Sequence, residues 1–590
     1  MKLTDYVARY LASLGIRHVF AVSGGASLHF IHSLDAVDGI DFVCTQHEQA
    51  GAMAADGYAR VTGEWGAAVA TSGPGATNLI TGICCSYYDS VPTIFLTGQV
   101  ATFRMSGETG VRQIGFQETP ILELCGPITN YAVQIRDPQQ IRFELEKATF
   151  LARRGRPGPV LIDIPDDVQR MEVDPDALVG FEPPEEELLP IDAEGVVEAL
   201  RRAERPVVVA GWGIRLARCA DAFRGWIERT QLPVALTWAV ADLLPGEHPC
   251  RIGTFGTHGT RYANFAVQNA DLILAIGSRL DTKATGSPPE TFAREATKIM
   301  VDIDAAELEK FSSFGLEIDM RIRADAGRAV AAFEAATAAT ELPDWSAWRA
   351  RIQQWKRAYP ASTEADHAEE AVNPYAFVRA LSRLCPTPCH VLIDTGCSIA
   401  WMMQAFEPRD GQRLLHDFNN TAMGWALPAA IGACFARPDV PVVCISGDGS
   451  LMMNLQELAT VARHELPITL FLMNNQGHSM IQQTQDQWLE SRYLASSVEG
   501  GLAFPEFGSV ARGFGWQSLE LARNQDCEAI IQQALELSGP VFCDVKIPAH
   551  HRVTPQVKFG RPNEDPEPLL PRDEFAANMI VAPLEVSRER

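Results

Sequence analysis

The stretch PVVCISGDGS at positions 441–450 decides the fold of this 590-residue chain. Its apolar run has the length of a buried strand, and Gly447-Asp448-Gly449 ends that run with the turn residues that a strand-to-helix bend requires. Apolar residues at three- and four-residue steps then predict a helix over 451–462. A second apolar run, PITLFLM at 467–473, predicts another strand and stops at Asn474-Asn475. This order of elements predicts a β-α-β unit.

Polar side chains end both predicted strands. If the strands are parallel, Asp448 and Asn475 lie at carboxyl ends, on the crevice side where open α/β sheets bind ligands. A carboxylate, an amide oxygen and the backbone carbonyl of Gly477 form an all-oxygen set suited to Mg²⁺ that carries a diphosphate. A GDG turn alone is most often only a turn. The NN pair at this spacing is what favours a metal site.

Length and composition limit the class of protein. The chain is too long for one core, so roughly three or four domains are expected. A formal charge of −24 argues against nucleic acid and anionic membranes as partners. No apolar run approaches the roughly 18 residues of a membrane span, and residues 1–15 favour an amphipathic helix over a signal peptide. We therefore expect a cytoplasmic protein that binds neither nucleic acid nor membranes. Its 13 scattered cysteines are expected to be reduced.

The chain alternates apolar strands with helical patterns, which predicts an α/β class with parallel sheets. Two polar stretches without periodicity, 174–194 and 361–373, are typical of linkers. The predicted domains are 1–180, 190–340 and 375–548, followed by a C-terminal tail over 549–590 that wraps the surface.

The pattern G-D-G-x24-N-N resembles the cofactor signature of enzymes that depend on thiamin diphosphate (ThDP) and Mg²⁺. The resemblance places Asp448, Asn475 and the Gly477 carbonyl in the metal-ligand positions. It also implies three doubly wound domains, which bind the pyrimidine ring, a flavin-type nucleotide and the diphosphate.

Glu48 stands at the junction of a predicted strand and helix, where a lone acid is most often only a favourable first-turn residue. Its setting, HEQAGAMAADGYAR at 47–60 followed by TSGPGATN at 71–78, is similar to the pyrimidine-binding domain of the ThDP family. There the matching glutamate contacts N1′ of the cofactor and shares a proton with it. Because Glu48 and Asp448 lie 400 positions apart, the resemblance implies that they meet across two subunits of a homodimer or homotetramer.

Further stretches resemble the acetohydroxyacid synthase (acetolactate synthase) branch over nearly the whole chain. Met423 matches the bulky residue that bends ThDP, and Ser398 stands where that branch usually has histidine. The backbone of 421–422 would hold the pyrimidine edge, although this segment fits a glycine-rich helix start equally well. The implied diphosphate and pyrimidine contacts are Gly396, Ser398, Thr421, Ala422, Gly449 and Ser450. The residues implied to face the reacting carbons are Gly24, Gly25, Phe116 and Gln117, and Met423 and Met480 complete the implied catalytic set.

The middle domain resembles the FAD domain of that branch. A lone G-x-G turn is weak support for a dinucleotide, but several glycine-rich turns and strand ends follow one another in the family's order. A flavin here would be structural, because decarboxylation and carboligation need no redox step. The implied FAD contacts are Gly211, Gly213, Thr257, His258, Gly259, Thr260, Arg279, Asp302 and Ile303.

The resemblance implies an enzyme that decarboxylates a 2-oxo acid, pyruvate, and joins the two-carbon unit to a second carbonyl compound. Lys283 stands where the branch has the arginine that grips a carboxylate acceptor, and Thr484 where it has a tryptophan that narrows the pocket. These two departures predict that neutral aldehydes or ketones are accepted at least as well as a second 2-oxo acid. The alternative is that Lys283 is a surface lysine and Thr484 a change without functional effect. An FAD-dependent pyruvate oxidase and a non-catalytic nucleotide-binding regulator are the alternatives; the full set of catalytic positions disfavours the regulator.

Overall fold

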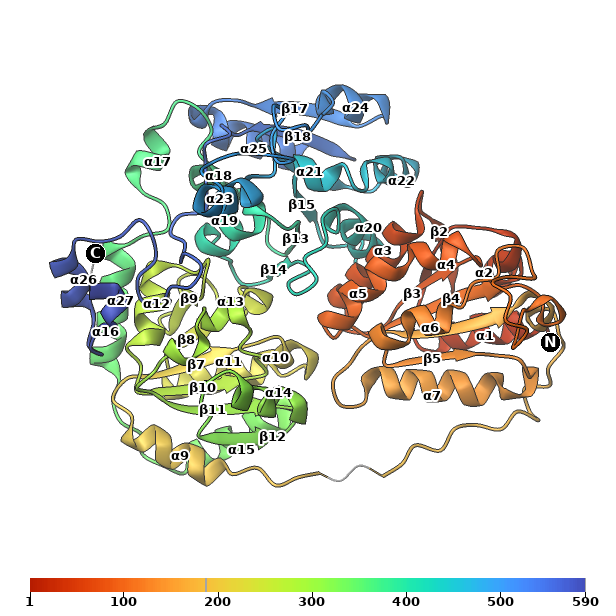
Figure 1. Cartoon of the computed structure of the whole chain (residues 1–590), viewed down its shortest axis with the longest axis horizontal. Helices are drawn as coiled ribbons and strands as arrows, with labels where there is room; N and C mark the ends of the chain where they lie inside the picture. The colour runs from red at the N-terminus through yellow and green to blue at the C-terminus, as the bar shows by residue number, and fades with distance from the viewer. Residues whose placement is uncertain (186–187, 589–590) are drawn as a thin grey trace.

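The computed structural model describes residues 1–185 and 188–588 and contains three α/β domains, each built on a six-stranded parallel sheet (Figure 1). The strand orders are β2-β1-β3-β4-β6-β5, β12-β11-β10-β7-β8-β9 and β14-β13-β15-β16-β18-β17. Each order reverses direction within the sheet, as in doubly wound folds. The predicted fold class is therefore confirmed. In the part of the chain that the structure describes, no helix has the length and apolar character to cross a membrane.

The first domain has two central strands, β3 and β4, that are buried over their whole length, as expected where helices cover both faces of a sheet. Its strands are β1 (His18–Ala21), β2 (Asp41–Cys44), β3 (Gly66–Ala70), β4 (Thr93–Gln99), β5 (Tyr131–Gln134) and β6 (Val160–Pro165). Its helices are α1 (Leu3–Ser13), α2 (Leu28–Ala36), α3 (Glu48–Thr62), α4 (Pro74–Asn78), α5 (Ile80–Tyr88), α6 (Ile121–Cys125), α7 (Ile141–Arg153) and α8 (Asp166–Gln169).

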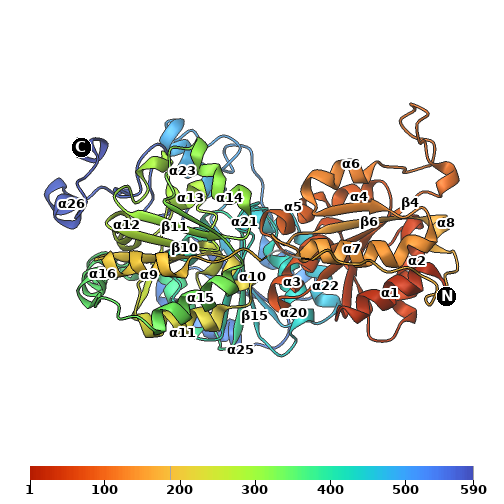
Figure 2. The same cartoon turned by 90° about the horizontal axis from the view of Figure 1, so that it is seen from below.

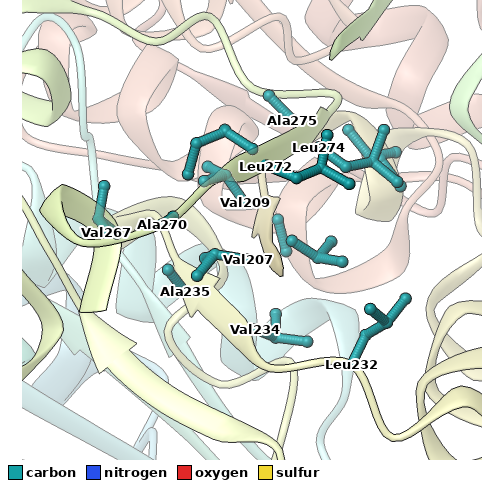
Figure 3. Packing of buried hydrophobic residues seen from close by; sticks show 14 of the residues in the cluster. Val207, Val209, Leu232, Val234, Ala235, Val267, Ala270, Leu272, Leu274 and Ala275 are labelled. Carbon is teal, nitrogen blue, oxygen red and sulfur yellow. The ribbon is translucent and has the colours of Figure 1, made fainter. Parts of the chain in front are cut away.

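The middle domain has the strand order of a dinucleotide-binding fold, with its switch point between β7 and β10. Valine, leucine and alanine side chains of β7, β8 and β10 pack into its core (Figure 3). Its strands are β7 (Pro206–Ala210), β8 (Val234–Leu236), β9 (Arg251–Thr254), β10 (Leu272–Ile276), β11 (Thr297–Asp302) and β12 (Met320–Arg323). Its helices are α9 (Ala193–Arg202), α10 (Gly213–Leu216), α11 (Ala220–Thr230), α12 (Arg261–Gln268), α13 (Thr282–Thr285), α14 (Ala305–Glu309), α15 (Ala326–Ala338) and α16 (Ser346–Ala358).

The third domain places β15 beside β16 in parallel, with Gly447 opposite Met473, as the opening motif predicts. Its strands are β13 (Cys389–Ile393), β14 (Gln412–Leu415), β15 (Val442–Gly447), β16 (Ile468–Asn474), β17 (Gln517–Leu521) and β18 (Val541–Lys546). Its helices, with those of the preceding linker and the tail, are α17 (Glu364–Ala368), α18 (Pro374–Leu384), α19 (Cys397–Ala405), α20 (Ala426–Ala436), α21 (Asp448–Leu451), α22 (Leu458–Arg463), α23 (Ser479–Trp488), α24 (Phe507–Gly513), α25 (Cys527–Glu536), α26 (Arg572–Asn578) and α27 (Glu585–Arg588).

The predicted single helix over 451–462 is wrong in one respect, because the chain breaks it between α21 and α22. Asn454 adopts a non-helical backbone, and its side-chain amide donates to the Gly424 carbonyl oxygen at 2.8 Å. An asparagine side chain competes in this way with the helical hydrogen-bond ladder. The break fastens the segment to the turn that precedes α20.

The first and third domains meet through α3 and α20, which lie side by side at the domain border (Figures 1 and 2). Both helices are rich in alanine and glycine. A Cβ on Gly57 would lie 2.5 Å from the Ala429 carbonyl oxygen, and one on Gly432 would collide with the Ala54 carbonyl. The small side chains therefore permit the two backbones to approach closely.

A buried ion cluster lies at the same border. The Arg60 guanidinium pairs with Asp56 at 2.7 Å and with Asp89 at 2.8 Å, and it donates to the His416 carbonyl oxygen at 2.9 Å. Asp89 also accepts the backbone N–H groups of Phe418 and Asn419. The cluster thus links the first domain to the loop before α20.

Glu457 makes a second polar link across this border. Its carboxylate accepts the Gln46 N–H at 3.0 and 3.3 Å and the Thr460 hydroxyl at 2.7 Å, and the residue has no exposed surface. Burial raises the pKa of Glu457 to about 7, although these donors act in the opposite direction. The link anchors the turn that leads into Glu48.

The raised pKa of Glu457 predicts a pH-dependent stability. The folded protein holds this proton up to about pH 7, while the unfolded chain loses it from its ordinary value of 4.5. The stability contributed by this group is present at low pH and is lost as pH rises through 7. Between about pH 5 and pH 8 the unfolding free energy of Glu457→Gln should fall less than that of wild type, by on the order of 3 kcal/mol. Its Tm should fall correspondingly less over the same range. Glu465→Gln, at an exposed acid of the same domain, serves as the control; equal slopes in all three proteins would contradict the prediction.

The C-terminal tail lies along the middle domain beside α16 (Figure 1). Val557 donates its N–H to the Thr257 carbonyl oxygen at 2.8 Å, and the Asn578 carboxamide accepts the Trp355 indole N–H at 2.8 Å. The side chain of Phe575 joins the middle-domain core. The tail is thus a packed part of the structure.

Candidate active site

A cavity opens at the carboxyl ends of β13, β15 and β16, between the third domain, the middle domain and the tail. Its wall unites segments that are more than two hundred positions apart in sequence. The sequence-predicted residues that line it are His258, Lys283, Gly396, Ser398, Thr421, Met423, Asp448, Gly449, Ser450, Asn475, Gly477, Met480 and Thr484.

Asp448 lies almost fully buried at the base of this cavity, 2% exposed. Its Oδ1 accepts the Gly449 N–H at 2.6 Å. Its Oδ2 accepts the N–H groups of Asn475 and Gly477 at 3.1 and 3.2 Å. Burial nevertheless raises the pKa of Asp448 to about 6. A divalent cation beside it would favour the carboxylate.

The amide of Asn475 faces the same point. Its Nδ2 donates to the Ser479 hydroxyl at 2.6 Å, which leaves the amide oxygen as the group available to a cation. Carboxylate and amide oxygens are hard ligands, so the donor set that Asp448 and Asn475 provide fits Mg²⁺.

Gly449, beside Asp448, lies directly against two side chains of the site. A Cβ on Gly449 would collide with Nε2 of His478 and would lie 3.3 Å from the Met423 methyl group. Gly424, at φ +85°, turns the chain directly after Met423. The structure therefore places Met423, the predicted support for a bent ThDP, against the turn that contains Asp448 and Gly449.

Three non-glycine residues near the predicted cofactor contacts have positive φ: Gln117 at 66°, Thr421 at 53° and Gln476 at 55°. Such a backbone is uncommon for any residue with a side chain and an outlier for a β-branched one such as threonine. Strain of this kind concentrates at functional sites. It supports the assignment of Gln117 and Thr421 to the site.

Asp394 is a member of the site that the sequence did not predict. It follows β13, is 1% exposed, and accepts the Gly424 N–H at 3.0 Å and the Ser446 hydroxyl at 3.0 Å. It thereby ties the Met423 turn to the end of β15. The signal was present in the sequence, because Asp394 ends an apolar run as Asp448 does.

The middle domain and the tail close the far side of the cavity. The Lys283 ammonium lies 5.6 Å from the centre of the Trp238 ring, and Nε2 of His258 lies 3.0 Å from Nε2 of Gln556. Burial, with Lys283 nearby, lowers the pKa of His258 to about 4, so that imidazole is neutral at neutral pH. Trp238 and Gln556 were not predicted from the sequence, because no local pattern brings them there.

The other predicted catalytic residues form a separate cluster in the first domain. Glu48 begins α3, and its Oε2 accepts the Asn78 amide N–H at 2.9 Å. A Cβ on Gly73 would lie 2.8 Å from that of Gln117, and Phe116 is 84% exposed. Gly25 opens the short helical turn after β1. None of the sequence-predicted members of this cluster lines the cavity that holds Asp448.

A groove at the switch point of the middle domain contains the predicted nucleotide contacts Gly211, Gly213, Arg279, Asp302 and Ile303. A Cβ on Gly213 would lie 2.7 Å from the Gly277 Cα, so the turns after β7 and β10 pack without side chains. Within the described chain the buried indole N–H of Trp212 has no hydrogen-bond partner in this groove. Glycine turns at a switch point are the feature by which open α/β sheets bind nucleotides.

The predicted contacts Thr257, Gly259 and Thr260 make hydrogen bonds that shape a turn. Thr257 donates its N–H to the Lys283 carbonyl oxygen, Gly259 donates to Gly256, and the Thr260 hydroxyl donates to the Thr254 carbonyl. This turn presents His258 to the cavity, while the tail covers its outer side.

Three parallel sheets, a pocket with a buried carboxylate and an amide at the strand ends and a separate glutamate cluster are the features expected of a ThDP-dependent enzyme. The sequence comparisons agree. Residues 1–121, 193–333 and 394–545 match the families described as "Thiamine pyrophosphate enzyme" N-terminal TPP binding domain, central domain and C-terminal TPP binding domain.

Within that class the chain belongs to the acetolactate synthase family. It is 36% identical to "Probable acetolactate synthase 2, chloroplastic" of Oryza sativa subsp. japonica, over 94% of this chain and 84% of that protein. It is 35% identical to "Acetolactate synthase large subunit" of Parasynechococcus marenigrum (strain WH8102), over 93% and 88%. It is 34% identical to "Acetolactate synthase, chloroplastic" of Arabidopsis thaliana, over 95% and 83%.

Proposed function

We propose that this enzyme decarboxylates pyruvate with ThDP and Mg²⁺ and transfers the two-carbon unit to a second carbonyl compound. The observation that carries the proposal is that Asp448, Asn475, Lys283 and Thr484 all line one cavity. Bound ThDP would supply the electron sink for decarboxylation. Asp448, Asn475 and Gly477 would hold the metal and diphosphate, and Met423 would support the cofactor. The acetolactate synthase relatives favour carboligation over the oxidase alternative.

The complete site is proposed to need a second copy of the chain, in a homodimer or homotetramer. Glu48 lies in the first domain, where its Oε2 accepts the Asn78 amide N–H, and it does not line the cavity of its own chain. The apolar side chains beside this cluster, Phe103 and Phe116, are 74% and 84% exposed. Burial against a partner would remove them from water. The cytoplasmic location stays a prediction.

The acceptor is proposed to be a neutral aldehyde or ketone. Lys283 offers a point charge where the bidentate fork of an arginine would bind a carboxylate. Thr484, on the cavity wall with its hydroxyl bonded to the Met480 carbonyl, leaves space where a tryptophan ring would fill it. A wider pocket with weaker carboxylate binding suits a bulkier uncharged carbonyl.

The test compares kcat/KM for 2-oxobutyrate and for a simple ketone, with pyruvate as donor. Wild type should prefer the ketone or use both equally, and Lys283→Arg/Thr484→Trp should shift the ratio toward 2-oxobutyrate by roughly ten- to a hundredfold, the worth of one charged hydrogen bond. Lys558→Arg, on the tail outside the cavity, should leave the ratio unchanged. A strong wild-type preference for 2-oxobutyrate would refute the acceptor assignment.

FAD is proposed as a structural cofactor of the middle domain, held in the groove between the Gly211 and Gly277 turns. The purified protein should be yellow and should release FAD on denaturation. The colour should persist during turnover with pyruvate, because the flavin takes no electrons in carboligation. A colourless preparation that is fully active without added flavin would rule out this cofactor.

A further inference from the structure

A cluster of metal-ligating side chains lies outside the active site, where the C-terminal tail begins. Glu369, from the segment between α17 and α18, lies beside the consecutive residues His550 and His551. One ligand atom of each residue lies within 4.8 Å of the others. The cluster therefore joins two chain segments that are about 180 positions apart in sequence.

His551 is oriented toward the carboxylate without bonding to it. Its Nε2 is buried and makes no hydrogen bond within the described chain, although Glu369 Oε2 lies only 3.3 Å away. The side chain of His551 is 11% exposed. A buried ring nitrogen without a partner is costly unless another group satisfies it.

The second oxygen of the Glu369 carboxylate is fixed by a hydrogen bond from Asn373. The Asn373 amide N–H donates to Glu369 Oε1 at 2.7 Å, which leaves Oε2 directed at His551. Asn373 is 2% exposed and also caps α18. Partners that orient a ligand in this way are typical of metal centres.

The spacing fits a tetrahedral ion. Bonds of about 2.1 Å place neighbouring ligand atoms about 3.4 Å apart, close to the 3.3 Å between His551 and Glu369. His550 lies at the surface with its ring centroid 4.4 Å from that of His551, so a rotation of its exposed side chain would close the set. Arg552, which follows His551 in the chain, is bonded to Asp486 at 2.9 Å.

We propose that Glu369, His550 and His551 form a binding site for a transition-metal ion of the zinc type, with water as fourth ligand. A set of two imidazoles and one carboxylate binds Zn²⁺ and Co²⁺ more strongly than it binds Mg²⁺. The ion fastens the start of the tail to the segment before α18. From there the tail runs through Val553, whose N–H donates to Gln483, to Gln556 on the cavity wall.

The experiment uses full-length protein that is stripped of metal and then saturated with Mg²⁺ and ThDP to occupy the Asp448 site. Co²⁺ is added, and its visible absorption reports tetrahedral coordination by nitrogen. Wild type should bind one Co²⁺ per chain at micromolar concentration, and Zn²⁺ should displace it. Glu369→Gln and His550→Asn should weaken Co²⁺ binding by at least about tenfold. Glu369→Gln keeps an oxygen for Asn373, so the fold is preserved.

His367→Asn is the matched control, because His367 lies nearby on α17 and bonds to Ser362 outside the cluster. It should bind Co²⁺ as wild type does. Zn²⁺ should also slow proteolytic cleavage of the tail several-fold in wild type and in this control, and not in Glu369→Gln. Equal Co²⁺ spectra and affinities in wild type and Glu369→Gln, or binding only at millimolar Co²⁺, would overturn the proposal. This outcome is independent of the carboligase activity.

Discussion

Replacing Glu48 by glutamine should slow turnover by roughly 10²- to 10⁴-fold while ThDP still binds, because the variant loses an acid–base group and keeps its shape. In the structure Glu48 Oε2 accepts the Asn78 amide N–H at 2.9 Å, and a glutamine oxygen can accept the same bond. What glutamine cannot do is share a proton with the pyrimidine ring. The effect should therefore appear in kcat and not in cofactor affinity.

The measurement is the rate of CO₂ release from pyruvate together with a ThDP titration. The control is Glu123→Gln, which changes an exposed glutamate in the first turn of α6, where the same residue type has only a helix-terminal role. It should retain wild-type activity. Turnover by Glu48→Gln within a few-fold of wild type would show that Glu48, too, is only a first-turn residue.

Replacing Asp448 by alanine should abolish ThDP binding at micromolar cofactor. The variant removes the proposed metal ligand and leaves the N–H groups of Asn475 and Gly477 without their acceptor. Loss of one charged hydrogen bond costs about 1.5–3 kcal/mol, and loss of the metal bridge adds to it. We expect an affinity decrease on the order of a hundredfold or more.

Tryptophan fluorescence can follow the titration with ThDP and Mg²⁺, because Trp238 and Trp401 line the cavity. Asp448→Asn, which keeps an oxygen for the backbone donors, separates loss of metal binding from local unfolding. Asp439→Ala, at an exposed acid paired with Arg437 before β15, is the control. Wild-type affinity in both Asp448 variants would exclude this carboxylate as a metal ligand.

The parts of the site that the sequence predicted lie where local chemistry and topology coincide. Asp448 and Asn475 each end an apolar strand, and parallel pairing alone brings them to one edge. The cavity residues that were not predicted from the sequence belong to distant segments that pack against the third domain. Gln556 belongs to the tail and Trp238 to the loop after β8, and no spacing in the sequence indicates that they share a wall.

The interrupted helix after Asp448 has a different cause. The apolar residues over 451–462 do follow a helical period. That period does not reveal that the side chain of Asn454 donates to the Gly424 carbonyl oxygen, which interrupts the helix. The nucleotide contacts predicted for the glycine-rich turn at 256–260 stay a prediction; the hydrogen bonds within this turn shape the loop that presents His258. Competition of side chains and turns for backbone groups is decided by tertiary contacts.

The buried ion cluster around Arg60 limits how this chain can be divided in the laboratory. A recombinant fragment of residues 1–180 would lose the His416 carbonyl that Arg60 binds and the Trp425 indole that donates to Asp56. It would also expose the alanine-rich face of α3 to water. Such a fragment should aggregate, because the apolar helix face would be exposed to water. The Arg60 pairs with Asp56 and Asp89 would remain, but they would lose the hydrogen bonds that the third domain supplies. Chimeras between relatives should therefore exchange α3 and α20 together, with the loop that contains His416.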